Sequence, residues 1–84
     1  MLLKELSEAI GVSGDESAVR QIVYNAIKDH VTDIEVDSIG NLTAFQKGIG
    51  DNLPRVMLAA HMDEIGFMVT GHDSNGNLRF ASIG

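Results

Sequence analysis

The sequence predicts an α/β fold, or α+β if the chain is taken as an isolated fragment, with two amino-terminal helices followed by strands of a mixed sheet. Two observations support this prediction. Apolar residues recur at helical spacing until about residue 27. Beyond that point, short apolar or alternating runs are separated by clusters of Gly, Asn, Asp and Ser, which is typical of strands joined by turns.

The first helix is expected over the opening residues, whose apolar positions share one helical face: Leu2, Leu3, Leu6 and Ile10. A second helix is predicted roughly over residues 15–30, where apolar residues recur three and four positions apart. Ser13 and Glu16 precede it in the S-x-x-E arrangement of a capping box, so we expect Ser13 to cap this helix.

Five short strands are expected after the helices, at residues 34–37, 42–45, 55–60, 66–70 and 78–81. The run 55–60 does not alternate between apolar and polar residues, so it predicts a strand that is buried on both faces. A chain of 84 residues has no helix left to cover the second face of such a strand. The pattern therefore suggests a piece of a larger protein.

Composition excludes several classes of function. The net charge of −6, with six Lys and Arg in total, argues against binding to nucleic acid or to an anionic membrane surface. The chain contains no Cys, which excludes disulfides and thiolate zinc sites. No apolar run approaches the about 18 residues that a membrane-spanning helix needs. A cytoplasmic location is therefore expected.

The candidate site is formed by His61 and Asp63, which directly follow the apolar run 56–60. In an extended chain, residues two positions apart point to the same side. A neutral imidazole can bind a metal ion, and a nearby carboxylate can orient the ring. Taken alone this signal is weak, because a single His at a strand end is usually structural. His72, at the mouth of a predicted hairpin, is expected in solvent.

A longer stretch strengthens the signal. Residues 56–69, VMLAAHMDEIGFMV, closely resemble the metal-binding strand of the tetrahedral aminopeptidase family. This family comprises the glutamyl- and deblocking-aminopeptidases and was once described as endoglucanase M. Residues 11–14 (GVSG), 37–42 (DSIGNL) and 75–80 (NGNLRF) resemble the opening of the same family in the same order and spacing. The similarity therefore covers essentially the whole chain.

The resemblance implies a dinuclear metallo-aminopeptidase that uses zinc or cobalt and a metal-activated water to remove amino-terminal residues from peptides. It places His61 as a ligand of one metal ion, through a neutral ring nitrogen, and Asp63 as the catalytic carboxylate behind it that orients the imidazole. The other ligands and the general base of the family lie beyond residue 84. The 84-residue chain alone is therefore expected to be inactive.

The resemblance also implies a domain organisation. Residues 1–65 would begin the catalytic domain, which has a zinc-aminopeptidase-like fold, and residues 66–84 would lead into the inserted β-rich domain used for oligomerisation. The complete enzyme would form dimers that build a larger homo-oligomeric particle, and this particle would admit short peptides.

Two alternatives remain open from the sequence. The chain could be an inactive fragment or degenerate relative that folds only by pairing its open strand edges with a partner chain. It could also be a glycan hydrolase, an endoglucanase, which would need two carboxyl groups about 5–9.5 Å apart and usually no metal. His61 ahead of Asp63 fits a metal site better than a pair of glycosidase carboxylates.

Overall fold

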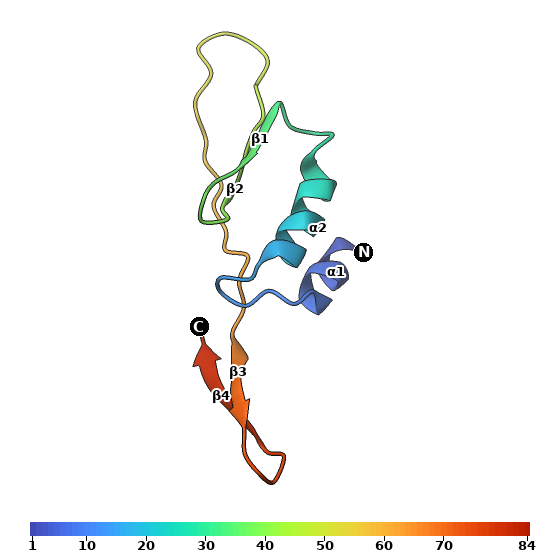
Figure 1. Cartoon of the computed structure of the whole chain (residues 1–84). Helices are drawn as coiled ribbons and strands as arrows, with labels where there is room; N and C mark the ends of the chain where they lie inside the picture. Colours follow the sequence, from blue (N-terminus) through green and yellow to red (C-terminus); the bar gives the residue numbers. More distant parts are fainter.

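The computed structural model describes residues 1–84 and has two helices followed by four strands (Figure 1). The helices are α1 (Leu2–Glu8) and α2 (Ser17–Ile27). The strands are β1 (Asp33–Val36), β2 (Leu42–Phe45), β3 (Gly66–His72) and β4 (Leu78–Ile83). The predicted order of two helices and then strands, and the α+β class of the isolated chain, are confirmed. Neither helix is long and apolar enough to cross a membrane.

The strands form two separate antiparallel pairs, β1 with β2 and β3 with β4. In the second pair, Phe67 and Phe80 pack edge-to-face, with ring centroids 4.7 Å apart and ring planes at 62°. Parallel pairing is limited to one isolated bridge, between Val12 and Glu64. This bridge joins the loop that precedes α2 to the segment that precedes β3.

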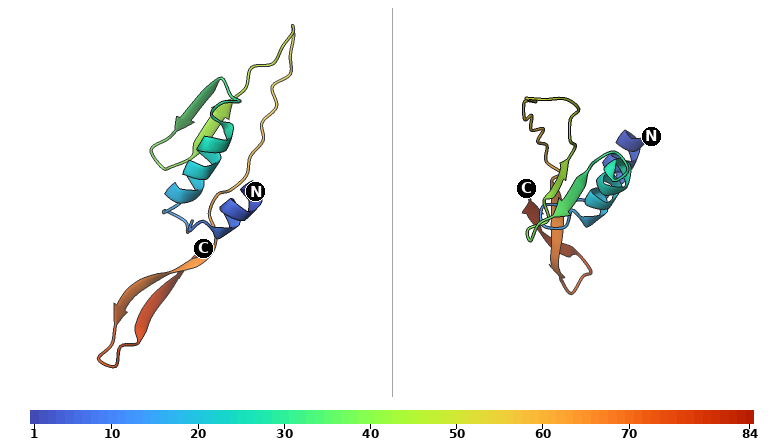
Figure 2. Two further views of the ribbon diagram at one scale, coloured as in Figure 1. Left: turned by 90° about the vertical axis from the view of Figure 1, so that its right-hand side faces the viewer. Right: turned by 90° about the horizontal axis from the view of Figure 1, so that it is seen from above.

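The molecule is elongated. Its principal extents are 68, 26 and 16 Å and its radius of gyration is 17.8 Å, whereas a compact domain of this length would have a radius of gyration of about 12 Å. The two helices and the β1–β2 pair lie at one end, and the β3–β4 hairpin projects away from them (Figures 1 and 2). Among the hydrophobic side chains, only that of Val19 on α2 is buried.

The predicted strand at residues 55–60 is wrong for this chain. Residues 53–63 carry no strand assignment and run as an unpaired segment past the β1–β2 pair (Figure 1). Val56, Met57 and Leu58 are 81–93% exposed rather than buried on both faces. The physical reason is that the strands of the 84 residues pair only with each other, so this segment has neither a hydrogen-bonded neighbour nor a covering layer.

The predicted capping box is also wrong. Helix α2 begins at Ser17, and no side-chain hydrogen bond caps its first turn. The Glu16 carboxylate accepts a hydrogen bond from the Gly14 N–H at 2.8 Å, and the Ser13 hydroxyl donates to Asp63 instead of to the helix. The physical reason is position: the N-cap residue of α2 is Glu16, so Ser13 lies three residues before the place from which a side chain could cap the helix.

Residues 37–41, with the sequence DSIGN, close the β1–β2 hairpin. Asp37 Oδ1 accepts hydrogen bonds from the N–H groups of Ile39 (3.0 Å) and Asn41 (2.9 Å), and Oδ2 accepts from the Asn41 side-chain amide (2.8 Å). Gly40 has φ +91°, a conformation that side-chain-bearing residues adopt at a cost. The carboxylate therefore substitutes for backbone acceptors and fixes the turn.

Residues 73–77, with the sequence DSNGN, build the same turn at the end of the β3–β4 hairpin. Asp73 Oδ1 accepts from the N–H groups of Asn75 (2.8 Å) and Asn77 (3.0 Å), and Oδ2 accepts from the Asn77 side-chain amide (3.0 Å). Gly76 has φ +82°. Two hairpins distant in the sequence are thus closed by one and the same hydrogen-bonding scheme.

Both turns should loosen in acid. Hydrogen bonds from the Asn side chains, and then from the backbone, hold the pKa values of Asp37 and Asp73 below the ordinary 3.8. A lowered folded-state pKa stabilises the turn fully above pH 3.8, and this contribution is lost as the pH falls through the folded-state value. The protection factors of the Ile39 and Asn75 amides in hydrogen exchange, which correct for the pH dependence of the intrinsic exchange rate, should therefore fall below pH 3.8.

The two matching turns provide their own control. In the Asp73→Asn variant, the acid dependence of the Asn75 amide should disappear while that of the Ile39 amide stays. Equal acid dependence at both amides in this variant would contradict the assignment of the effect to the local carboxylate.

Candidate functional site

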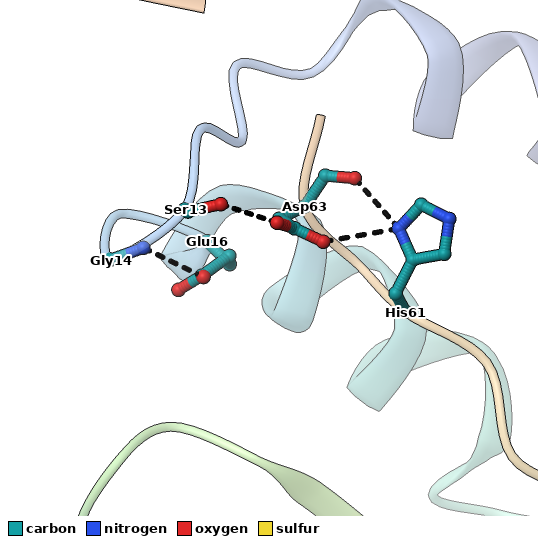
Figure 3. A network of polar contacts seen from close by, with 5 residues as sticks. All are labelled: Ser13, Gly14, Glu16, His61 and Asp63. Atoms are coloured by element: carbon teal, nitrogen blue, oxygen red, sulfur yellow. Dashed lines mark hydrogen bonds and ion pairs between the residues drawn. The ribbon is translucent and has the colours of Figure 1, made fainter. Parts of the chain in front are cut away.

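His61 and Asp63, the two predicted site residues, lie in direct contact (Figure 3). The Nδ1 atom of His61 is 3.0 Å from Asp63 Oδ1 and 2.9 Å from the Asp63 carbonyl oxygen. Both partners can only accept, so Nδ1 carries the proton and donates it. In the neutral ring, Nε2 then keeps its lone pair. The imidazole side chain is 85% exposed, which leaves Nε2 accessible to a ligand.

Asp63 has a second partner, Ser13, which lies 50 residues earlier in the chain (Figure 3). The Ser13 hydroxyl donates a hydrogen bond to Asp63 Oδ2, while Oδ1 accepts from His61. The hydrogen bond from Ser13, and then that from His61, lower the pKa of Asp63 below its ordinary value. The carboxylate is therefore ionised near neutral pH and accepts a hydrogen bond on each oxygen.

The backbone brings Ser13 to Asp63 through the bridge between Val12 and Glu64. The Glu64 N–H donates to the Gly11 carbonyl at 2.8 Å. A Cβ atom on Gly11 would lie 2.6 Å from a methyl of Val19, and a Cβ atom on Gly66 would lie 2.2 Å from a methyl of Val12. The loop thus packs closely against α2 on one side and against the start of β3 on the other.

An open cavity of about 270 Å³ lies beside this contact, lined by Glu16, residues 39–41 and residues 60–63. Its wall at residues 39–41 is the turn of the β1–β2 hairpin, and Arg20 of α2 holds this turn by donating to the Gly40 carbonyl at 2.9 Å. The volume is enough for several water molecules. The cavity can therefore admit a small ligand next to His61.

The donor set fits part of a metal site. A neutral imidazole whose other ring nitrogen donates to a carboxylate is the usual arrangement of a zinc-ligating histidine. No group of three or more His, Cys, Asp or Glu side chains in the 84 residues could hold a metal ion together, whereas a catalytic zinc site uses three protein ligands. The chain can therefore supply one ligand of such a site but does not close it.

His72 lies at the far end of β3 and is exposed, as expected, with Nδ1 3.3 Å from the Asp73 carbonyl oxygen. It does not line the cavity beside His61. Ser13 is the site residue that the sequence reasoning missed. Its S-x-x-E context indicated a helix cap, and no local pattern could reveal a partner 50 positions away.

Comparison with known proteins gives the family. The model of the M42 glutamyl aminopeptidase family matches residues 40–84, and a second family model, AMPT, matches residues 1–22. The chain is 43% identical over 84 residues to a lysyl aminopeptidase of Pyrococcus furiosus, and this match covers 99% of the chain and 23% of that protein.

Solved structures agree with these matches. The aminopeptidase APDkam598 from the archaeon Desulfurococcus kamchatkensis superposes with a TM-score of 0.89 at 36% identity, covering 99% of this chain and 23% of that one. PhTET1-12s, described as a dodecamer, gives a TM-score of 0.80 at 40% identity, covering 99% and 24%. The chain spans about a quarter of the length of the curated relatives it matches. The resemblance read from the sequence is thus confirmed, and the chain belongs to the M42 glutamyl aminopeptidase family.

Proposed function

We propose that these 84 residues are the amino-terminal part of a metal-dependent aminopeptidase that removes amino-terminal residues from peptides. The observation that carries this proposal is the His61–Asp63 contact. The carboxylate accepts a hydrogen bond from the Nδ1–H group, so Nε2 is left free beside an open cavity. Family membership supports the reaction class. The negative charge of the chain favours the cationic free amino terminus of a peptide.

In this proposal His61 would hold one of two divalent ions, zinc or cobalt, through Nε2, and Asp63 would fix the orientation of the ring. The remaining ligands come from residues that follow position 84. The bound ions supply Lewis-acid polarisation of the scissile carbonyl and lower the pKa of a water molecule to about 7. The isolated 84-residue chain is inactive in this view, because one imidazole does not close a catalytic metal site.

We also propose the division into domains. Residues 1–65 begin the catalytic domain, and residues 66–84 lead into the β-rich oligomerisation domain. The projection of the β3–β4 hairpin away from both helices supports this division (Figure 1). The similarity to a protein described as a dodecamer supports a homo-oligomer, and we propose that dimers build it. The cytoplasmic location stays a prediction.

The glycan-hydrolase alternative is disfavoured by the family match, and Asp63 does not fit the proton-donating role in a glycosidase. A glycosidase needs a carboxylic acid whose pKa is raised, so that it can protonate the leaving group. The hydrogen bonds from Ser13 and His61 instead lower the pKa of Asp63. This carboxylate is suited to orienting an imidazole and not to donating a proton.

The proposal is tested by assaying the full-length protein on aminoacyl anilides and on β-glucan, with and without a chelator. We expect anilide hydrolysis that the chelator abolishes and that added zinc or cobalt restores, and no cleavage of glucan. Chelator-resistant cleavage of glucan would overturn the peptidase assignment. A full-length protein without activity on either substrate, with metal supplied, would favour the degenerate-relative alternative.

A further inference from the structure

We propose that Ser13 is a positioning residue of the metal site, which acts on His61 through Asp63. Its hydroxyl holds the Asp63 carboxylate in the rotation at which the other carboxylate oxygen meets the His61 ring. This inference rests on the proposed function, because it assigns Ser13 a role toward the ion that His61 would hold.

The first argument is the freedom of an aspartate side chain. The terminal torsion of Asp is broad, so a carboxylate held at one oxygen can still rotate. The Asp63 side chain is 38% exposed, so packing alone does not immobilise it. Hydrogen bonds at both oxygens, from Ser13 and from His61, do restrict the rotation. Without the Ser13 hydroxyl, Oδ2 would be left to water and Oδ1 would meet the ring for a smaller fraction of the time.

The second argument is that Ser13 is itself held in place. The bridge between Val12 and Glu64 fixes the neighbouring backbone, and the Gly11 carbonyl accepts from the Glu64 N–H at 2.8 Å. The close approaches of Gly11 to Val19 and of Gly66 to Val12 leave no room for a methyl group. A loop that is anchored on two sides can position a hydroxyl group.

The third argument is that the Ser13 hydroxyl has no other role in the structure. It does not cap α2, because the N-cap residue of this helix is Glu16 and the first turn has no side-chain cap. The Gly14 N–H is engaged by Glu16 instead. The one hydrogen bond of the Ser13 hydroxyl crosses 50 residues to reach Asp63.

The test measures zinc affinity of the full-length protein by competition with a chromophoric chelator. Ser13→Ala should weaken binding of zinc by about 3–10-fold, which is less than the full cost of losing a hydrogen bond to a charged group, because water can replace the hydroxyl at Oδ2. Ser13→Thr keeps the hydroxyl and should bind zinc within about twofold of the wild type. Ser7→Ala is the matched control, because Ser7 donates only to the Leu3 carbonyl of α1, and its affinity should not change.

A double-mutant cycle separates positioning from a general loss of structure. If Ser13 acts through Asp63, then Ser13→Ala should have no further effect on zinc affinity in the Asp63→Ala background. Full additivity of the two effects would overturn the proposal, and so would an unchanged zinc affinity of Ser13→Ala. The unfolding temperature of the metal-free variants identifies any loss of fold, and a drop for Ser13→Ala that Ser13→Thr does not rescue would also overturn it.

Failure of this inference is distinguishable from failure of the proposed function. If His61→Ala removes a bound ion while Ser13→Ala leaves zinc affinity unchanged, the metal role of His61 is supported and the positioning role of Ser13 is rejected. If His61→Ala leaves the bound zinc and the activity of the full-length protein unchanged, both the proposed metal site and the positioning role of Ser13 are rejected.

Discussion

The His61→Ala variant of the full-length protein is expected to lose aminopeptidase activity and one of the two metal ions that we propose it binds. The imidazole is the one ligand that we propose for residues 1–84, with Nδ1 donating to Asp63 and Nε2 left free. A site that loses one of three protein ligands no longer holds its metal with the required geometry. Metal content after dialysis and the rate of anilide hydrolysis measure the two effects.

The matched control for this variant is His72→Ala. His72 is also exposed and also contacts a backbone carbonyl, but it lies at the other end of β3, away from the cavity. Its removal should change neither metal content nor activity. Full activity of His61→Ala, or an equal loss in both variants, would be incompatible with a metal role for His61.

The Asp63→Ala variant should lose about 10–100-fold in metal affinity or activity, the range found for partners that orient a metal-ligating histidine. The carboxylate accepts a hydrogen bond from the Nδ1–H of His61, so its loss leaves only the backbone carbonyl of residue 63 to orient the ring and fix its tautomer. Metal affinity by chelator competition and kcat/KM on an aminoacyl anilide would measure this.

Asp51→Ala provides the control for the removed charge, because Asp51 lies exposed in the loop between β2 and the unpaired segment. It should leave both quantities unchanged. If Asp63→Ala left metal affinity and kcat/KM as unchanged as Asp51→Ala does, then Asp63 would not be the residue that orients His61.

Local patterns predicted most of the secondary structure. Helix α2 appears where apolar residues recur at helical spacing, and β2 appears at residues 42–45 as expected. The turns at residues 37–41 and 73–77 lie where Asn and Gly indicated them, because their hydrogen bonds join residues two to four positions apart. Such elements depend on neighbours in sequence, so sequence alone can predict them.

Elements that depend on distant partners could not be predicted in the same way. The apolar run 55–60 has the composition of a central strand, but a strand also needs neighbours, and none of the other strands pairs with it. Ser13 has the local context of a helix cap, and its hydroxyl bonds instead to a carboxylate 50 residues away. His61 and Asp63 were predicted because their contact spans two residues.

The unpaired segment around Val56, Met57 and Leu58 has a practical consequence for the laboratory. Apolar side chains next to free backbone N–H and C=O groups offer a template on which other chains can add as β-strands. Residues 1–84 expressed alone would therefore tend to aggregate, and an inactive precipitate would say nothing about metal chemistry. Work on this site therefore needs the proposed full-length enzyme, in which further strands would cover the segment.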